Sequence, residues 1–189
     1  MKKDTLNFRE IFSRRIGMNE VDEITYLIQG SNLHKQALYN LVYDDDEMMA
    51  FQAAWTLTHL SFKENEWLSG KQDELIDEVM TCQHAGKRRL ILNLLLHQPL
   101  ANPPRIDFLD FCLERMISVK ELPGVRSLCM KLAYELCRPI PELLQELRVI
   151  LELIEPDLLV PSVYAVRKNV LKAMQKRKSV TCGEKIYKR

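Results

Sequence analysis

The chain has 189 residues, of which 47% are hydrophobic and 28% are charged, and its formal net charge is +1. These values are typical of a soluble globular protein, and the length suits a single domain over 1–189 whose core needs no disulfide or metal. The longest apolar run, 90–96, is far too short to cross a bilayer, and the N-terminus lacks the apolar segment of a signal peptide, so we expect a cytoplasmic protein without a membrane partner.

Helical periodicity runs through the whole chain, and strand signals are nearly absent. We expect helices near 4–15, 20–29, 32–43, 46–61, 72–83, 86–98, 106–118, 124–137, 140–154 and 161–177. All eight prolines fall between these segments or in their first turns, where proline is tolerated. The sequence therefore predicts an all-α fold.

Four of these helices resemble one another, and each follows another amphipathic helix. They begin at Met48, Gly86, Pro123 and Pro161, which are 38, 37 and 38 residues apart. Helix pairs at this period cannot bury their apolar faces alone and therefore stack. We expect a right-handed α-α superhelix of about four to five helical pairs. Capping helices would occupy 1–31, helical repeats 32–176, and a basic, flexible tail 177–189.

The stretch LYNLVYDDDEMMAFQAAWTLTHLS, residues 38–61, is similar to HEAT and armadillo-type repeats. The resemblance lies in the leucine-rich first helix, the acidic turn and the Ala-Ala pair of the second helix. Two later second helices carry the Val-Arg pair that often opens such helices, at Val125-Arg126 and Val166-Arg167. The second repeat departs from this pattern with Lys87-Arg88-Arg89, and the first with Met49-Ala50. The resemblance covers 32–176 and implies an α-solenoid. It also implies that Arg88, Arg126 and Arg167 bind an acidic or carbonyl group in a neighbouring turn.

The four carboxylates of Asp44–Glu47 suggest either a cation site or a helix start. A calcium loop needs alternating ligands and a turn glycine, and this stretch has neither. We therefore expect Asp45 or Asp46 to cap the next helix, whose positive end favours negative charge. No catalytic motif such as a phosphate-binding loop, HExxH or GxSxG is present. We expect no catalytic residue, no metal and no cofactor. These absences favour a binding protein over an enzyme, and a metabolic enzyme stays open as a third alternative.

The repeat spacing places one stripe of each second helix, here called the ridge, opposite the core. In the first repeat Met49, Ala53, Leu57 and Leu60 form the core face, and the ridge carries Phe51, Trp55 and His59. The equivalent positions are Arg89, Asn93 and His97, then Ser127, Lys131 and Glu135, and last Lys168, Lys172 and Lys176. Such a ridge usually lines the concave surface of a solenoid. We therefore expect a protein or peptide partner to bind at Trp55, His59, Arg89, Asn93, His97, Lys131 and Glu135.

Three questions stay open at this point. Trp55 either anchors a partner or is covered by an N-terminal helix. His59 and His97 occupy equivalent positions in adjacent repeats, but no third ligand suggests a metal. Lys168, Lys172 and Lys176 either contact phosphates or form a solvated end of the stack.

The basic end of the chain leaves a second function open. Residues 161–189 carry nine Lys or Arg and one acid. Such a segment suits a phosphate or an acidic surface. The chain also loosely resembles HEAT-like DNA glycosylases of alkylation repair, which use a basic concave face. This resemblance makes nucleic-acid binding the alternative to a protein partner.

Overall fold

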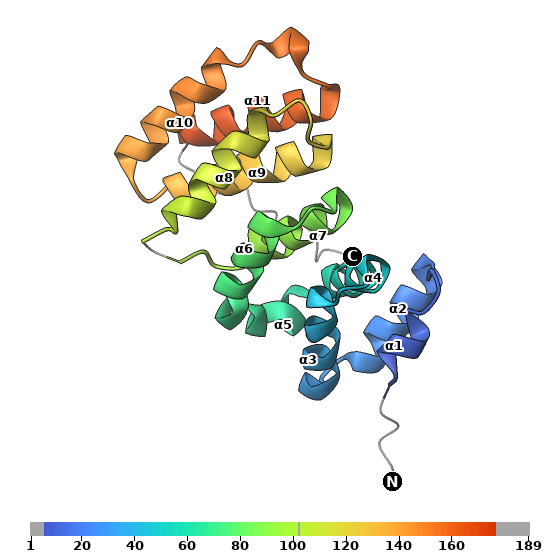
Figure 1. Ribbon diagram of the computed structural model, residues 1–189. Coiled ribbons are helices and arrows are strands. Elements are labelled where there is room, and N and C mark those ends of the chain that lie inside the picture. Colours follow the sequence, from blue (N-terminus) through green and yellow to red (C-terminus); the bar gives the residue numbers. More distant parts are fainter. Residues whose placement is uncertain (1–5, 102, 177–189) are drawn as a thin grey trace.

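The computed structural model describes residues 6–101 and 103–176, which contain only helices and connecting loops (Figure 1). The expected tail, 177–189, lies outside the described residues, as do the first five residues of the expected N-terminal cap. The α-helices are α1 Phe8–Ile11, α2 Met18–Ile28, α3 Asn32–Asn40, α4 Glu47–Thr58, α5 Phe62–Asn65, α6 Gln72–Thr81, α7 Ala85–Leu96, α8 Ile106–Ile117, α9 Pro123–Cys137, α10 Pro141–Leu153 and α11 Pro161–Lys176. Short 3₁₀ helices follow α3, α5 and α10 at Leu41–Tyr43, Glu66–Lys71 and Pro156–Leu158.

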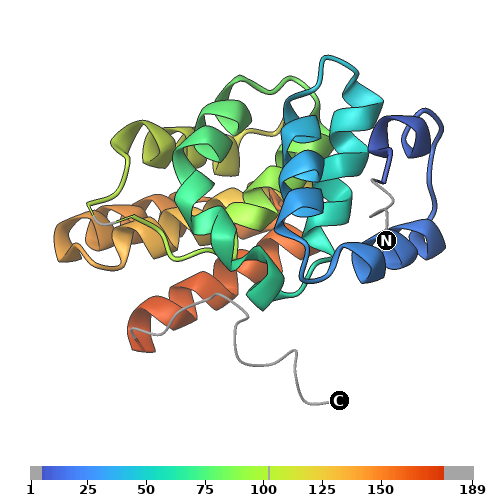
Figure 2. The same cartoon turned by 90° about the horizontal axis from the view of Figure 1, so that it is seen from below.

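The helices stack as pairs from the N-terminal to the C-terminal end (Figure 1). The predicted first helices are α3, α6, α8 and α10, and the predicted second helices are α4, α7, α9 and α11. Seen from below, α3 and α4 lie side by side (Figure 2). The second helices pack extensively on one another in succession, whereas the first helices make few contacts with each other. In a curved stack the more closely packed row lies on the inner side, so the second helices form the inner row. The expected all-α solenoid is confirmed.

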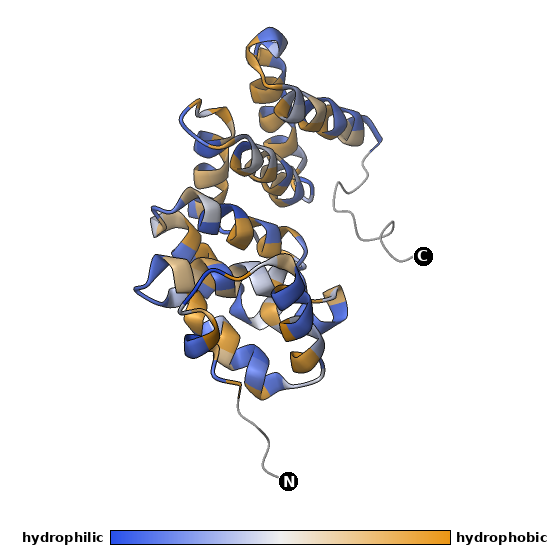
Figure 3. Cartoon of the chain, turned by 90° about the vertical axis from the view of Figure 1, so that its right-hand side faces the viewer, coloured by the Kyte–Doolittle hydropathy of each residue, from blue (hydrophilic) through white to orange (hydrophobic). Residues whose placement is uncertain are grey.

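One continuous core runs through the stack from Phe8 to Met174. Hydrophobic and hydrophilic residues alternate along the helices, as amphipathic packing requires (Figure 3). Fully buried side chains occur from the first helices to the last, including Phe12, Leu57 and Phe108. No described helix combines the length and the apolar character that a membrane span requires.

The segments before and after the first helix pair differ from the prediction. The expected helix 4–15 is only the four-residue α1, because the chain turns at Ser13–Gly17 and binds Gln52 instead of continuing the helix. The Gln52 side chain accepts from Ile16 N at 2.7 Å and donates to the carbonyls of Phe12 and Arg14. Residues 62–71, for which no helix is predicted, form α5 and a 3₁₀ helix.

The α5 segment is held by contacts that are distant in sequence. The side-chain amide of Asn65 donates to Leu57 O at 2.7 Å, near the end of α4. The Lys35 ammonium, in α3, pairs with the Glu64 carboxylate at 3.0 Å. These bonds join α5 to helices α3 and α4, and neither local helix propensity nor hydrophobic periodicity indicates such contacts. Sequence patterns therefore miss this helix.

The repeated arginines bind where the resemblance to HEAT repeats implies. Arg88 and Arg126 lie at the end of the first turn of a second helix, and Arg167 lies in the second turn of α11. Each donates to a carbonyl at the end of the preceding first helix. The bonds are Arg88 to Cys82 O at 2.6 Å, Arg126 to Met116 O at 3.2 Å and Arg167 to Leu151 O at 2.6 Å. Carbonyls at a helix C-terminus lack intrahelical partners and carry partial negative charge. A guanidinium donates hydrogen bonds to these carbonyls and brings a positive charge that offsets theirs. The arginines therefore hold the last three helix pairs together.

The acidic turn before α4 caps the helix, as predicted. The Asp46 carboxylate accepts from Met48 N at 2.9 Å and from Met49 N at 3.1 Å. Asp44 accepts from Asp46 N and pairs with Arg9. Asp44 thus ties the N-terminal segment to the first repeat, and Asp46 caps the start of α4.

Replacing Asp46 with alanine is expected to lower the free energy of unfolding by about 1 kcal/mol, because two amide donors at the start of α4 lose their acceptor. The matched control is Asp45→Ala, one residue earlier and exposed, with an expected change below about 0.5 kcal/mol. Urea unfolding followed by circular dichroism measures both. Equal losses in the two variants would contradict the cap.

Candidate functional site

The ridge lies on the inner row of helices. The core face of α4 is buried, with Met49, Ala53, Leu57 and Leu60 each at most 7% exposed. On the opposite side Trp55 is half-buried and His59 is exposed. In the following repeats Arg89 is exposed, whereas Asn93, His97 and Lys131 are half-buried; in the last repeat Lys168, Lys172 and Lys176 are all exposed. The predicted division of these helices into two faces is therefore observed.

Glu135 is the exception among the predicted ridge residues. Only 8% of its surface is exposed, and its carboxylate pairs with Arg138 at 3.0 Å. The end of α9 is buried almost all round, because α7, α8, α10 and α11 all pack against this helix. Glu135 therefore offers a partner little surface, which sets it apart from the other predicted ridge residues.

Two glycines let ridge side chains cross onto the next helix. A Cβ atom at Gly86 would lie 3.0 Å from the Phe51 ring, and one at Gly124 would lie 2.9 Å from Arg89 Cδ. Phe51 and Arg89 are 38 residues apart, and so are Gly86 and Gly124. The same ridge position thus packs over the first turn of the next second helix in two successive repeats, which supports the register of the ridge.

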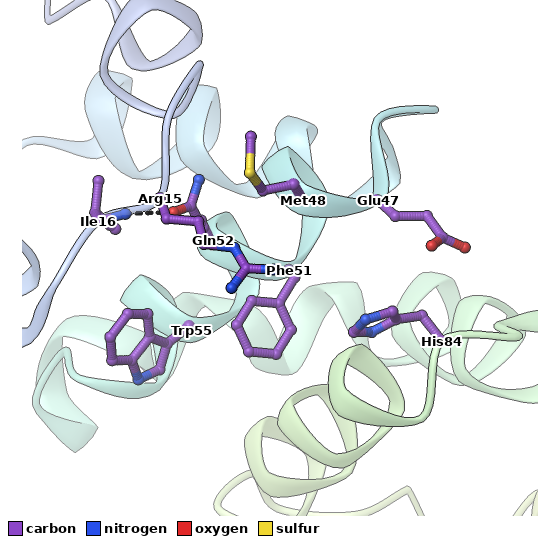
Figure 4. A pocket seen from close by; sticks show the side chains of 8 residues that line it. All are labelled: Arg15, Ile16, Glu47, Met48, Phe51, Gln52, Trp55 and His84. Atoms are coloured by element: carbon purple, nitrogen blue, oxygen red, sulfur yellow. Dashed lines mark hydrogen bonds between the residues drawn. The ribbon is translucent and has the colours of Figure 1, made fainter.

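A pocket of about 460 Å³ opens beside Trp55 (Figure 4). The ring centroids of Phe51 and Trp55 are 6.4 Å apart, and the His84 ring meets Phe51 edge-on at 5.5 Å from the other side. The volume lies within the range of about 300–1,000 Å³ that is common for ligand sites. Its lining residues are Arg15, Ile16, Glu47, Met48, Phe51, Gln52, Trp55 and His84.

Trp55 is partly covered by the N-terminal segment and partly open to a pocket. Arg15 and Ile16, from the loop between α1 and α2, line the pocket beside the tryptophan, and the Ile16–Gln52 bond fastens that loop (Figure 4). The N-terminal segment therefore packs next to Trp55 without burying it, and forms one wall of a cavity whose other wall is α4. The indole contributes to the core on one side and to the pocket on the other.

The sequence analysis missed Arg15, Ile16, Met48, Gln52 and His84 as site residues. His84 precedes α7, where its Nδ1 accepts from Lys87 N at 2.9 Å as the helix cap. This bond turns the ring toward Phe51. The position of His84 just before α7 could have indicated a helix cap. The approach of residues 15 and 16 to α4 could not have been predicted, because no repeat relates these two segments.

The ridge histidines share one local role. His59 Nδ1 donates to Trp55 O at 2.9 Å, and His97 Nδ1 donates to Asn93 O at 2.7 Å. Each histidine is the C-cap residue of its helix, where carbonyls lack partners. Their equivalence across the repeat is confirmed. Within 6–101 and 103–176, no group of three or more His, Cys, Asp or Glu residues is placed to hold a metal ion.

The thiols of Cys112 and Cys137 stay protonated near neutral pH. Cys82, Cys112, Cys129 and Cys137 are buried free thiols. Burial raises the pKa of Cys112 well above its ordinary value and the pKa of Cys137 to about 12. A thiolate, not a thiol, is the nucleophile, and a raised pKa keeps these groups protonated near neutral pH.

Charge is divided between the two rows of helices. The first helices of the pairs form the outer row, and three of them, α6, α8 and α10, contain ten Asp or Glu and two Lys or Arg. The inner-row helices α7, α9 and α11 contain nine Lys or Arg and one acid, the poorly exposed Glu135. Near-neutral overall charge therefore conceals an acidic outer row and a basic inner row.

Comparison with known proteins agrees with this geometry. The sequence profile of a HEAT repeat domain matches residues 8–174, which is most of the chain and nearly all of the described helices. No curated protein and no solved structure matches the chain. The matched range includes nearly all of the four helix pairs, the arginines that hold the last three of them and the Trp55 pocket. The chain therefore belongs to the HEAT repeat family.

Proposed function

We propose that this protein is a non-enzymatic binding module that holds a protein or peptide partner along its ridge. The single observation that carries the proposal is the Trp55 pocket. A half-buried tryptophan beside a cavity of about 460 Å³ lies on the inner row of an α-solenoid, where extended binding surfaces form. Tryptophan is enriched among the residues that contribute most to binding at protein interfaces.

The remaining ridge residues support an extended contact rather than a single point. His59, Arg89, Asn93, His97 and Lys131 continue from the pocket along α4, α7 and α9 with exposed or half-buried side chains. Their polar groups can orient a partner while the pocket supplies apolar contact, the division of roles that is usual in interfaces. Membership of the HEAT repeat family is compatible with this role but does not assign a partner.

Replacing Trp55 with alanine is expected to weaken partner binding by about thirtyfold or more, the usual effect of removing a central tryptophan. The test uses immobilised wild-type and variant protein to capture partners, followed by titration of each captured protein. The control is Tyr26→Ala, which removes an aromatic ring that is 75% exposed on α2, away from the ridge. A partner retained equally by all three proteins would show that binding occurs outside the pocket.

A further inference from the structure

We infer that the partner is an extended acidic segment with one bulky apolar side chain, which fills the Trp55 pocket while its carboxylates lie along the basic inner row. This inference rests on the proposed function and specifies the chemistry of the partner. Two features of the described residues carry it, the charge of the ridge and the lining of the pocket, together with the general spacing of packed helices.

The basic groups of the inner row fall into two sets. Arg88, Arg126 and Arg167 bind helix carbonyls, and Lys87 pairs with Glu78 at 2.7 Å. These cations serve the packing of the repeats. The second set projects from the ridge and has no ion pair among the described residues: Arg89, Lys131, Lys168, Lys172 and Lys176. Cations that packing does not use are available to an anionic partner.

Acids are scarce along the same path. The four inner-row helices α4, α7, α9 and α11 contain two carboxylates, Glu47 and Glu135. Glu47 lies at the start of α4 on the pocket wall, and Glu135 is paired with Arg138. From the pocket to the exposed lysines of α11, a partner would therefore meet positive and neutral side chains. Complementary charge of this kind steers an acidic chain to one face of the protein.

The pocket accepts an apolar side chain rather than a carboxylate. Phe51, Trp55, Met48 and Ile16 contribute rings, a thioether and an aliphatic group to its lining. The charged groups Arg15 and Glu47 are exposed, so they can remain hydrated while an apolar residue enters. A buried apolar anchor surrounded by polar contacts is the usual arrangement at an interface.

Helix spacing defines the pattern of acids. Packed helices lie about 8–10 Å apart, and an extended peptide advances about 3.3 Å per residue. One step along the inner row therefore corresponds to about three peptide residues. An anchor at α4 places acids that are about three, six and nine residues away near Arg89, Lys131 and Lys172.

Nucleic acid suits the ridge less well than an acidic peptide. The net charge is +1, and ten acids lie on the neighbouring outer-row helices α6, α8 and α10. Proteins that bind nucleic acid usually carry a clear excess of basic groups over the domain. The described ridge also places single cations one helix apart, which matches spaced carboxylates better than a continuous row of phosphates.

The test is fluorescence anisotropy with labelled ten-residue peptides. One has leucine at one end and glutamate at every third position from it; a matched peptide has glutamine instead of glutamate, and each is made in both chain directions. The glutamate peptide is expected to bind at least about tenfold more tightly in one direction, with affinity that falls as salt rises. A ten-nucleotide single-stranded DNA is the competing probe.

Matched variants locate the charge. Arg89→Glu is expected to weaken the glutamate peptide about threefold to tenfold, and Arg148→Glu on the exposed side of α10 is expected to leave its affinity unchanged. The triple variant Arg89→Glu, Lys131→Glu, Lys172→Glu should lose binding altogether. Circular dichroism and thermal unfolding verify that each variant remains folded.

Each other outcome overturns the inference in a distinguishable way. Equal binding of the two peptides, lost on Trp55→Ala, would leave the proposed function standing and remove the acidic partner. Binding of the DNA alone would overturn both. Failure of every probe would overturn the acidic segment, and the capture experiment with Trp55→Ala would still decide the proposed function.

Discussion

Replacing Arg88 with alanine is expected to lower the free energy of unfolding by about 3 kcal/mol, because it removes one member of a buried ionic cluster. Arg88 Nη1 lies 2.5 Å from Glu121 Oε1, and Arg115 Nη1 lies 2.8 Å from the same oxygen. The Arg88 and Glu121 side chains are 8% and 4% exposed. The variant leaves the Glu121 carboxylate buried with a single partner and leaves Cys82 O without its donor. Urea unfolding measures the loss.

The adjacent residue supplies the control for this prediction. Arg89 has the same chemistry but is exposed on the ridge, so Arg89→Ala should change stability by less than about 1 kcal/mol. Substitutions at these two neighbours are expected to have different effects. Replacing Arg88 lowers the free energy of unfolding, whereas replacing Arg89 lowers the affinity for the acidic partner. Equal stability of Arg88→Ala and the wild type would show that the cluster contributes nothing to holding the second and third repeats together.

Replacing Leu57 with alanine is expected to lower the free energy of unfolding by about 3 kcal/mol, through lost transfer energy and the cavity that remains. Leu57 is fully buried on the core face of α4, directly behind the ridge. The surrounding helices cannot collapse into the space without moving the stacked repeats. Urea unfolding, with thermal unfolding as a second measure, tests the assignment of this face to the core.

The matched control for Leu57 is the same substitution at an exposed position. Leu33, in α3, is 67% exposed, and Leu33→Ala should change stability by less than about 0.5 kcal/mol. Similar losses at the two positions would contradict the division of the helices into core and solvent faces. A large loss at Leu57 alone would support the register on which the ridge is defined.

Local and periodic information was sufficient for most of the fold. The second helices begin within about two residues of the predicted positions, which is no more than the usual uncertainty of helix ends. Asp46 caps α4, and Arg88, Arg126 and Arg167 bind the ends of the preceding helices. These features depend on a few neighbouring residues or on the 38-residue spacing, and both are visible in one sequence.

The candidate site was only partly visible for the same reason. The sequence indicated Trp55 and the ridge, because periodicity assigns faces to a helix. It also contained the charges of the two rows, but these acquire meaning only when the pairs stack and every second helix lies on the inner side. Glu135 shows the limit of the approach, since its burial depends on several helices that pack around the end of α9.

The sequence by itself determined that this protein is a stack of helix pairs, because repeated apolar stripes have to be buried against neighbouring repeats. Tertiary structure alone decided the pocket. Residues 15 and 16 reach Trp55 through the Gln52 hydrogen bonds, and no repeat relates that loop to α4. Contacts between segments unrelated by the repeat leave no period in the sequence, so they emerge only from the folded chain.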